Sequence, residues 1–155
     1  MRLTTRTSLA TRVLIFCATH EGQVVKTSDI ARAYDASSHH LGHVIHQLQH
    51  HGYVSTFRGR AGGLMLNKKP RDISIGRLFR IFEAGATVTG CFASTDNSCP
   101  LIADCRLRDF LTRAVEAFYR ELDPITLDDL VRDNCGLETI LKMAPDRSAR
   151  CPTAA

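Results

Sequence analysis

The chain has 155 residues, a formal net charge of +4 and 44% hydrophobic residues. This length predicts one domain, or one compact domain with an appendage, and the apolar content is sufficient for a buried core. No run of about 18 apolar residues is present, which argues against a transmembrane helix and a membrane partner. The apolar run VLIFCA is short and is not followed by a small-residue cleavage site, so we expect no signal peptide and a cytoplasmic protein. In the cytoplasm, reduced thiols are favoured over disulfides.

The charge is unevenly distributed along the chain. Residues 1–72 contain ten Lys and Arg against four Asp and Glu, whereas residues 73–155 contain ten against twelve. The N-terminal half is therefore the candidate for binding a polyanion. On charge alone, an ordinary solvated basic surface is the favoured interpretation.

Helical periodicity and turn residues predict three helices and a hairpin in the N-terminal half. The helices are expected over residues 7–20, 27–34 and 38–51, where apolar residues recur at helical spacing. Two short β-rich stretches, 53–57 and 64–67, flank the glycine-rich loop RGRAGG and predict a β-hairpin. This is the element order of a winged helix-turn-helix. The expected N-caps are Thr27 or Ser28 for the second helix, and Ser37 or Ser38 for the third.

The C-terminal half is predicted to add three helices. The first has the sequence IGRLFRIFEAG with Ser74 as its N-cap, and a short helix after Pro124 has Thr126 as its N-cap. Between them a long helix is expected over residues 104–122, and its apolar face needs a packing partner. The predicted fold class is mainly α with a small β-hairpin wing, a winged helix-turn-helix followed by a long C-terminal helix.

The helix over residues 38–51 carries a polar face that suits contact with base edges in the major groove. This face consists of Ser38, His39, His40, His43, His46 and Gln47. Glycines beside the hairpin arginines allow the backbone to approach a phosphate or the minor groove closely. These features, in the basic half, favour a winged-helix DNA-binding protein. The expected DNA-contacting residues are Arg2, Thr27, Ser38, His39, His40, His43, Arg58 and Arg60, and Arg6 is a further candidate for a phosphate contact.

The histidines have a second interpretation. His39 and His43, like His46 and His50, are four residues apart, a spacing at which two imidazoles on one helix can share a metal. No nearby Cys or carboxylate completes such a site. We therefore expect these histidines to face solvent or DNA.

Three cysteines, Cys91, Cys99 and Cys105, form the pattern C-x7-C-x5-C, which is too widely spaced for the C-x2-C pairs of zinc fingers. Three thiolates on one loop can hold three irons of a cubane cluster and leave the fourth iron to another ligand. A reversible disulfide switch is the alternative. Cys17 lies on an apolar helix face and is expected in the core.

The opening MRLT, the RGRAGG wing and C-x7-C-x5-C before a long helix together resemble the Rrf family of winged-helix iron–sulfur transcriptional regulators. The resemblance covers residues 1–141. The segment NSCPLIADCRLRDFLTRAVEAFYRELDPITLDDLV is most similar to the nitric-oxide-sensing NsrR branch, with the RirA and IscR branches as close relatives. The resemblance implies a homodimeric repressor whose binding to a double-stranded DNA operator depends on an iron–sulfur cluster. The cluster would be of the 4Fe–4S type, with 2Fe–2S as the alternative, held by Cys91, Cys99 and Cys105.

One position departs from the pattern of these relatives. An acidic side chain near the N-terminus of the partner subunit can be their fourth iron ligand, and the matching position here is Ser8. A serine hydroxyl is a poor iron ligand unless it is deprotonated. The signal is expected to be nitric oxide, with iron or redox state, or a disulfide switch without a cluster, as alternatives.

The residue patterns and the resemblance together give the expected division of the chain. The segments are a DNA-binding domain at 1–72, a connecting helix at 73–90, a cluster loop at 91–105, a dimerisation helix and short C-terminal helix at 106–143, and a disordered tail at 144–155. An enzyme is not expected, because we find no nucleophile–base pair, phosphate loop or convincing pair of carboxylates. A cluster carrier or a protein-binding adaptor is the alternative from another class.

Overall fold

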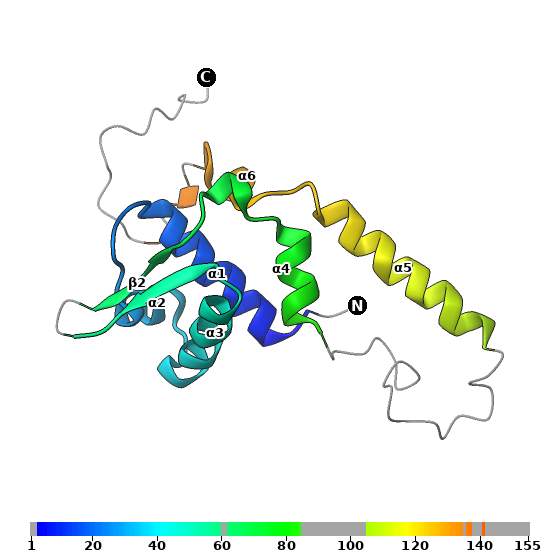
Figure 1. Ribbon diagram of the computed structural model, residues 1–155, viewed down its shortest axis with the longest axis horizontal. Coiled ribbons are helices and arrows are strands. Elements are labelled where there is room, and N and C mark those ends of the chain that lie inside the picture. The colour runs from blue at the N-terminus through cyan, green and yellow to red at the C-terminus, as the bar shows by residue number, and fades with distance from the viewer. Residues whose placement is uncertain (1–2, 60–61, 85–104, 135, 138–140, 142–155) are drawn as a thin grey trace.

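The computed structural model describes residues 3–59, 62–84, 105–134, 136–137 and 141 (Figure 1). Cysteines 91 and 99, arginines 2 and 60, and the tail 144–155 lie outside these residues. Most described residues are helical, and the strands pair as a two-stranded sheet. The elements in chain order are α1 (Thr5–Thr19), α2 (Thr27–Tyr34), α3 (Ser38–His50), β1 (Val54–Phe57), β2 (Gly63–Leu66), the 3-10 turn η1 (Pro70–Asp72), α4 (Ile75–Phe82), α5 (Arg106–Leu122) and α6 (Leu127–Val131).

Helices α1, α2 and α3 enclose the core of the N-terminal half. Leu14, Ile30 and Leu48, one from each helix, are completely buried. The tight turn between α2 and α3 is made by Asp35, which takes a left-handed conformation with φ of 48°. Burial of this apolar contact surface is the main force that holds the three helices together.

The β-hairpin forms the wing, as predicted, and packs against α1 and α3. β1 and β2 are antiparallel, with Val54 opposite Leu66. On its other edge, Leu64 exchanges two backbone hydrogen bonds of 2.8 Å with Val25, which precedes α2. A side chain at Gly63 would place its Cβ 2.2 Å from the Val25 carbonyl oxygen, so this close approach requires glycine.

Helix α4 packs beside α1, and α5 leaves this body as an arm that extends away from the rest of the fold (Figure 1). The chain returns to the core through α6. There Leu127 is completely buried, and its backbone N–H donates to the Ile73 carbonyl at 2.9 Å. The arm is thus held at its C-terminal end by the main body of the protein.

The fold class is confirmed, and most element positions agree with the prediction within two residues. α1 begins earlier than expected because the Thr4 side chain accepts a hydrogen bond from the Thr7 N–H and caps the helix. The caps at Ser74 and Thr126 are confirmed. The cap predicted at Thr27 or Ser28 is wrong, since Lys26 is the N-cap of α2 and Thr27 is its first helical residue. In the described residues, no helix is both long and apolar enough to span a membrane.

Candidate nucleic-acid interface and cysteine site

Helix α3 divides sharply into a buried side and an exposed side. Its apolar residues Leu41, Val44, Ile45 and Leu48 are buried. The predicted polar residues Ser38, His39, His40, His43 and His46 are all exposed, and Gln47 is half-buried. The helix therefore presents a row of hydrogen-bonding side chains to the solvent, on a scaffold fixed by the core.

Two of these histidines touch. The Nε2 atoms of His39 and His43 lie 3.3 Å apart, and their rings meet nearly edge to face at an interplanar angle of 85°. The ring of His40 is more distant, with its centroid 6.1 Å from that of His39. One turn of helix thus brings two imidazole nitrogens to a single point on the exposed face.

A groove of about 620 Å³ lies between this face and the first turn of α1. Arg6 and Thr5 line it from α1, and His40, His43 and His46 line it from α3. The structure therefore brings the basic start of α1 together with the histidine row. A groove with these donors suits a polar, negatively charged ligand such as a nucleic-acid backbone.

The wing presents a cation at its tip. Arg58 is exposed, and the following Gly59 has φ of 102°, a conformation that favours glycine. The turn closes through a 2.9 Å hydrogen bond from the Gly62 N–H to the Gly59 carbonyl. Thr27, by contrast, is half-buried at the start of α2. It is not brought together with the histidine row by any contact in the described residues.

Among the three predicted cluster ligands, Cys105 lies within the described residues. It is the N-cap of α5, is partly exposed, and its side chain makes no capping hydrogen bond. Its sulfur is thus accessible from solvent and is not engaged in capping the helix, so it is available to a metal. Ser8, the position matched to the fourth ligand, is half-buried on α1. The Cys105 environment therefore fits an iron–sulfur ligand.

Cys17, unlike Cys105, is poorly placed to bind a metal. It is 2% exposed, and burial raises the pKa of its thiol to about 12. The neutral thiol that burial favours is a poor metal ligand. Its expected place in the core is confirmed.

Sequence patterns gave no indication of a buried carboxylate at the N-terminus of α1. Glu83, at the end of α4, is 7% exposed and accepts hydrogen bonds from the Thr4 N–H at 2.8 Å and the Thr4 hydroxyl at 3.1 Å. The hydroxyl of Thr7 also donates to it. A negative charge at a helix N-terminus is stabilised by the helix dipole and the free N–H groups. Glu83 thus ties α4 to α1, immediately before the cysteine-bearing segment of the chain.

A second unpredicted cluster joins α4 to α5. The Arg80 guanidinium donates to both carboxylate oxygens of Glu116, at 2.7 and 3.0 Å, and to Asp123 at 2.9 Å. It also lies over the Tyr119 ring, 4.8 Å from the centroid. The hydrogen bonds from Arg80 lower the pKa of Glu116 below its ordinary range. Because arginine makes a planar contact with both oxygens of a carboxylate, these interactions fix the orientation of α5 relative to α4 as well as the distance between them.

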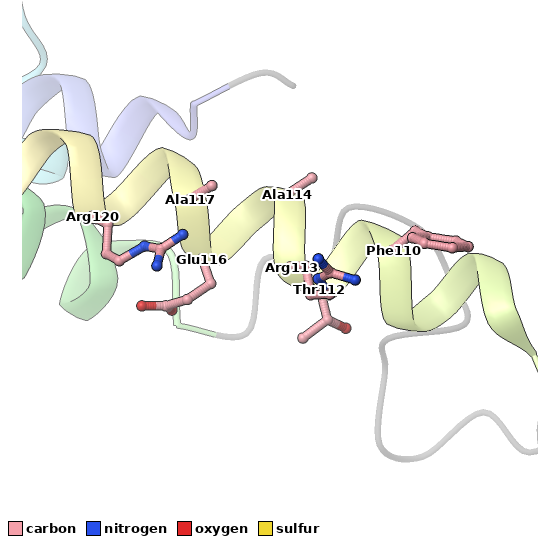
Figure 2. A pocket seen from close by; sticks show the side chains of 7 residues that line it. All are labelled: Phe110, Thr112, Arg113, Ala114, Glu116, Ala117 and Arg120. Atoms are coloured by element: carbon pink, nitrogen blue, oxygen red, sulfur yellow. The ribbon is translucent and has the colours of Figure 1, made fainter.

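Beyond this cluster α5 has an uncovered apolar side. None of its residues is fully buried, and Leu107 and Phe110 are 64% and 62% exposed. Figure 2 shows Phe110, Ala114 and Ala117 along one side of α5, with Thr112 and Glu116 on the opposite side. A surface hollow of about 630 Å³ runs along these residues. The predicted face is therefore only partly covered within one chain, since Leu111, Val115, Phe118 and Leu122 are half-buried.

This arrangement, a helix-turn-helix with a hairpin wing and an exposed polar third helix, defines the winged-helix class. The family model described as "Rrf2: Iron-dependent Transcriptional regulator" matches residues 3–133, and the chain belongs to this family of regulators, which are not enzymes.

Named relatives agree with this family assignment, and a solved structure agrees with the fold. The chain is 43% identical over 143 residues to the HTH-type transcriptional regulator NsrR of Geobacillus kaustophilus, covering 92% of this chain and 97% of the relative. It is 44% identical over 133 residues to the HTH-type transcriptional repressor NsrR of Streptomyces coelicolor, covering 84% and 88%. The solved structure of T. potens IscR shares the fold, with a TM-score of 0.66, 24% identity, and coverage of 94% of this chain and 93% of that chain.

Proposed function

We propose that this protein is a dimeric transcriptional repressor whose binding to a DNA operator is controlled by an iron–sulfur cluster that senses nitric oxide. The proposal rests chiefly on the position of Cys105 in the fold. This thiol begins the same helix that Arg80 braces against α4, and Glu83 connects α4 to the DNA-binding helices. The names of the NsrR relatives support the nitric-oxide signal.

Operator recognition falls to α3 and the wing. α3 enters the major groove, where Ser38, His39, His40 and His43 contact base edges. Arg58 at the wing tip contacts a phosphate or the minor groove, and we assign the same role to Arg60. Arg2 remains a predicted phosphate contact, and Thr27 remains a predicted DNA contact. The repressor acts where the operator is, in the bacterial cytoplasm.

Dimerisation falls to α5. Two copies of this helix would cover the side that carries Leu107, Phe110 and Ala114, whose exposure in one chain is otherwise costly. A two-fold dimer places the two α3 helices on successive turns of the major groove, about 34 Å apart. Any change in the direction of α5 therefore changes that spacing.

Cys91, Cys99 and Cys105 would hold the cluster. When bound, a 4Fe–4S or 2Fe–2S cluster supplies iron that reacts with nitric oxide. Ser8 would leave the fourth iron position weakly held or open to an external ligand, because a neutral hydroxyl is a poor donor to iron. Cys105 would then link cluster binding to α5, since this proposed ligand is also the N-cap of that helix.

Two contacts would transmit a movement of α5 to the DNA-binding helices, one between α5 and α4 and one between α4 and α1. Rotation of α5 pulls on the Arg80–Glu116–Asp123 cluster, and α4 passes this movement to α1 through Glu83. α1 lines the groove that α3 also lines, so the recognition helix responds to the same movement.

A matched pair of cysteine variants tests this proposal. Protein purified without oxygen is used to select operator sequences from a random duplex library, and DNA affinity is then measured with and without nitric oxide. The wild type and Cys17→Ala are expected to lose operator affinity when nitric oxide is added, whereas Cys99→Ala is expected to be insensitive to it. A Cys99→Ala protein that binds and responds like the wild type refutes the proposal. Response to an iron chelator but not to nitric oxide would instead favour an iron-responsive regulator, as the family description suggests.

A further inference from the structure

The Nε2 atoms of His39 and His43 have the spacing of two ligands on one metal ion. They lie 3.3 Å apart. Zinc binds imidazole nitrogen at about 2.0–2.1 Å with tetrahedral angles, which places two such nitrogens about 3.3–3.4 Å from each other. The two nitrogens therefore already have the separation that one ion requires, and binding needs only a small reorientation of the rings toward it.

We propose that His39 and His43 form a binding site for a divalent transition-metal ion of the zinc and copper class on the exposed face of α3, and that the bound metal competes with DNA. Both rings are exposed, so the metal has direct access from solvent. In the free protein the two Nε2 atoms share one hydrogen bond, so one ring carries its proton on Nε2; when both nitrogens bind a metal, that ring takes the neutral tautomer with its proton on Nδ1.

The other coordination positions are open. Within the described residues no third His, Cys, Asp or Glu joins this pair, so water completes the shell. Two imidazoles and water suit Cu²⁺ and Zn²⁺, with Cu²⁺ the tighter of the two by the usual order of affinities. Affinity falls as the pH falls, because protons compete for the same nitrogens.

The competition with DNA rests on the proposed function of α3. The nitrogens that bind metal are the ones assigned to base edges, and a bound metal removes their free donor and acceptor positions. A hydrated ion also occupies the space that the floor of the major groove would take. Metal binding is therefore expected to reduce sequence-specific affinity more than the salt-dependent affinity for random DNA.

Calorimetric titration of the full chain with ZnCl₂ tests the site. A second pair with the same spacing on α3 gives a matched control. His46 and His50 are also four residues apart, but their rings do not touch in the structure, where His50 instead contacts His51. His39→Gln and His43→Gln are expected to lose one bound Zn²⁺ per chain relative to the wild type, while His46→Gln retains it. Any zinc held by the cysteines is present in all four proteins and cancels in the comparison.

Two further readouts complete the test. The imidazole NMR signals of His39 and His43, but not of His46, are expected to shift when zinc is added. Operator affinity of the wild type is expected to fall with added zinc and recover with a chelator. His43→Gln lacks a proposed base contact and starts from a lower affinity, but its affinity should be the same with and without zinc. Equal zinc stoichiometry in the wild type, His39→Gln and His43→Gln overturns the site. Zinc binding at the pair that leaves operator affinity unchanged overturns the competition, whereas failure to bind any operator without zinc refutes the proposed function instead.

Discussion

Glu83 and Thr4 connect the two ends of the DNA-binding body, since the Glu83 carboxylate accepts hydrogen bonds from both the backbone N–H and the hydroxyl of Thr4. Thr4 is also the N-cap of α1. The same carboxylate therefore stabilises the start of one helix and fixes the end of another. The chain continues from Glu83 toward the cysteine segment, so a change there reaches Glu83 through a short stretch of backbone and α1 through the Glu83 hydrogen bonds.

Replacement of Glu83 by alanine is expected to destabilise the fold by about 1–3 kcal/mol, because it leaves the buried hydroxyl of Thr7 and the partly buried donors of Thr4 without this acceptor. Glu83→Gln retains an acceptor oxygen but removes the negative charge at the N-terminus of α1, and should cost less. Urea unfolding of the two variants measures the difference. Equal stability of the wild type and Glu83→Ala would contradict this role.

The Arg80 cluster is expected to contribute stability only while its acidic partners are ionised. Arg80 lowers the pKa of Glu116, so folding favours the ionised carboxylate. Such a contribution is present above the ordinary glutamate pKa of about 4.3 and is lost as the pH falls through the lower pKa of the folded state. The stability difference between the wild type and Arg80→Ala should therefore be constant between pH 6 and 8 and shrink below about pH 4. A difference that persists unchanged in acid would assign the effect to packing on Tyr119 instead.

Two glycines on different helices are expected to respond oppositely to alanine. A Cβ at Gly76 would lie 2.3 Å from an Asp123 carboxylate oxygen and 2.6 Å from the Asp123 backbone nitrogen, so Gly76→Ala should destabilise by about 1–3 kcal/mol. At Gly42 on α3 a Cβ meets nothing within 4 Å, and Gly42→Ala should stabilise by about 1 kcal/mol through helix propensity. The thermal unfolding midpoints of the two variants, each compared with that of the wild type, measure these changes. A stabilised Gly76→Ala protein would mean that α4 and the end of α5 are not packed as closely as described.

Cys17 is expected to resist alkylation in the folded protein. Burial raises its pKa to about 12, so almost no thiolate exists at neutral pH, and its side chain is closed to solvent. Cluster-free protein treated with iodoacetamide at pH 8 should be modified at Cys105 while Cys17 becomes reactive only after denaturation, as peptide mass spectrometry would measure. Rapid native labelling of Cys17 would show that α1 opens locally.

The two sides of α3 show what the sequence could predict and what it could not. The apolar spacing of Leu41, Val44 and Leu48 correctly assigns the buried side, because helical periodicity alone decides which residues face the core. The same spacing indicates that His39 and His43 are neighbours, but the meeting of their Nε2 atoms depends on side-chain rotamers that no pattern specifies. The hydrogen-bonding roles of Glu83 and Arg80 could not be predicted from the sequence for a related reason. Their partners are 36 to 79 residues away in the chain, so their roles exist only once the helices have packed.

In the proposed mechanism, a cluster held by Cys91, Cys99 and Cys105 couples nitric oxide to operator binding. The most direct test adds nitric oxide stepwise to anaerobically purified protein bound to its operator, and records the visible absorbance and the DNA-bound fraction in the same sample. We predict an iron–sulfur absorbance band that bleaches in parallel with release of the DNA. Full release of the DNA from protein that shows no cluster absorbance, or complete bleaching of the cluster band while the operator stays bound, would contradict this mechanism.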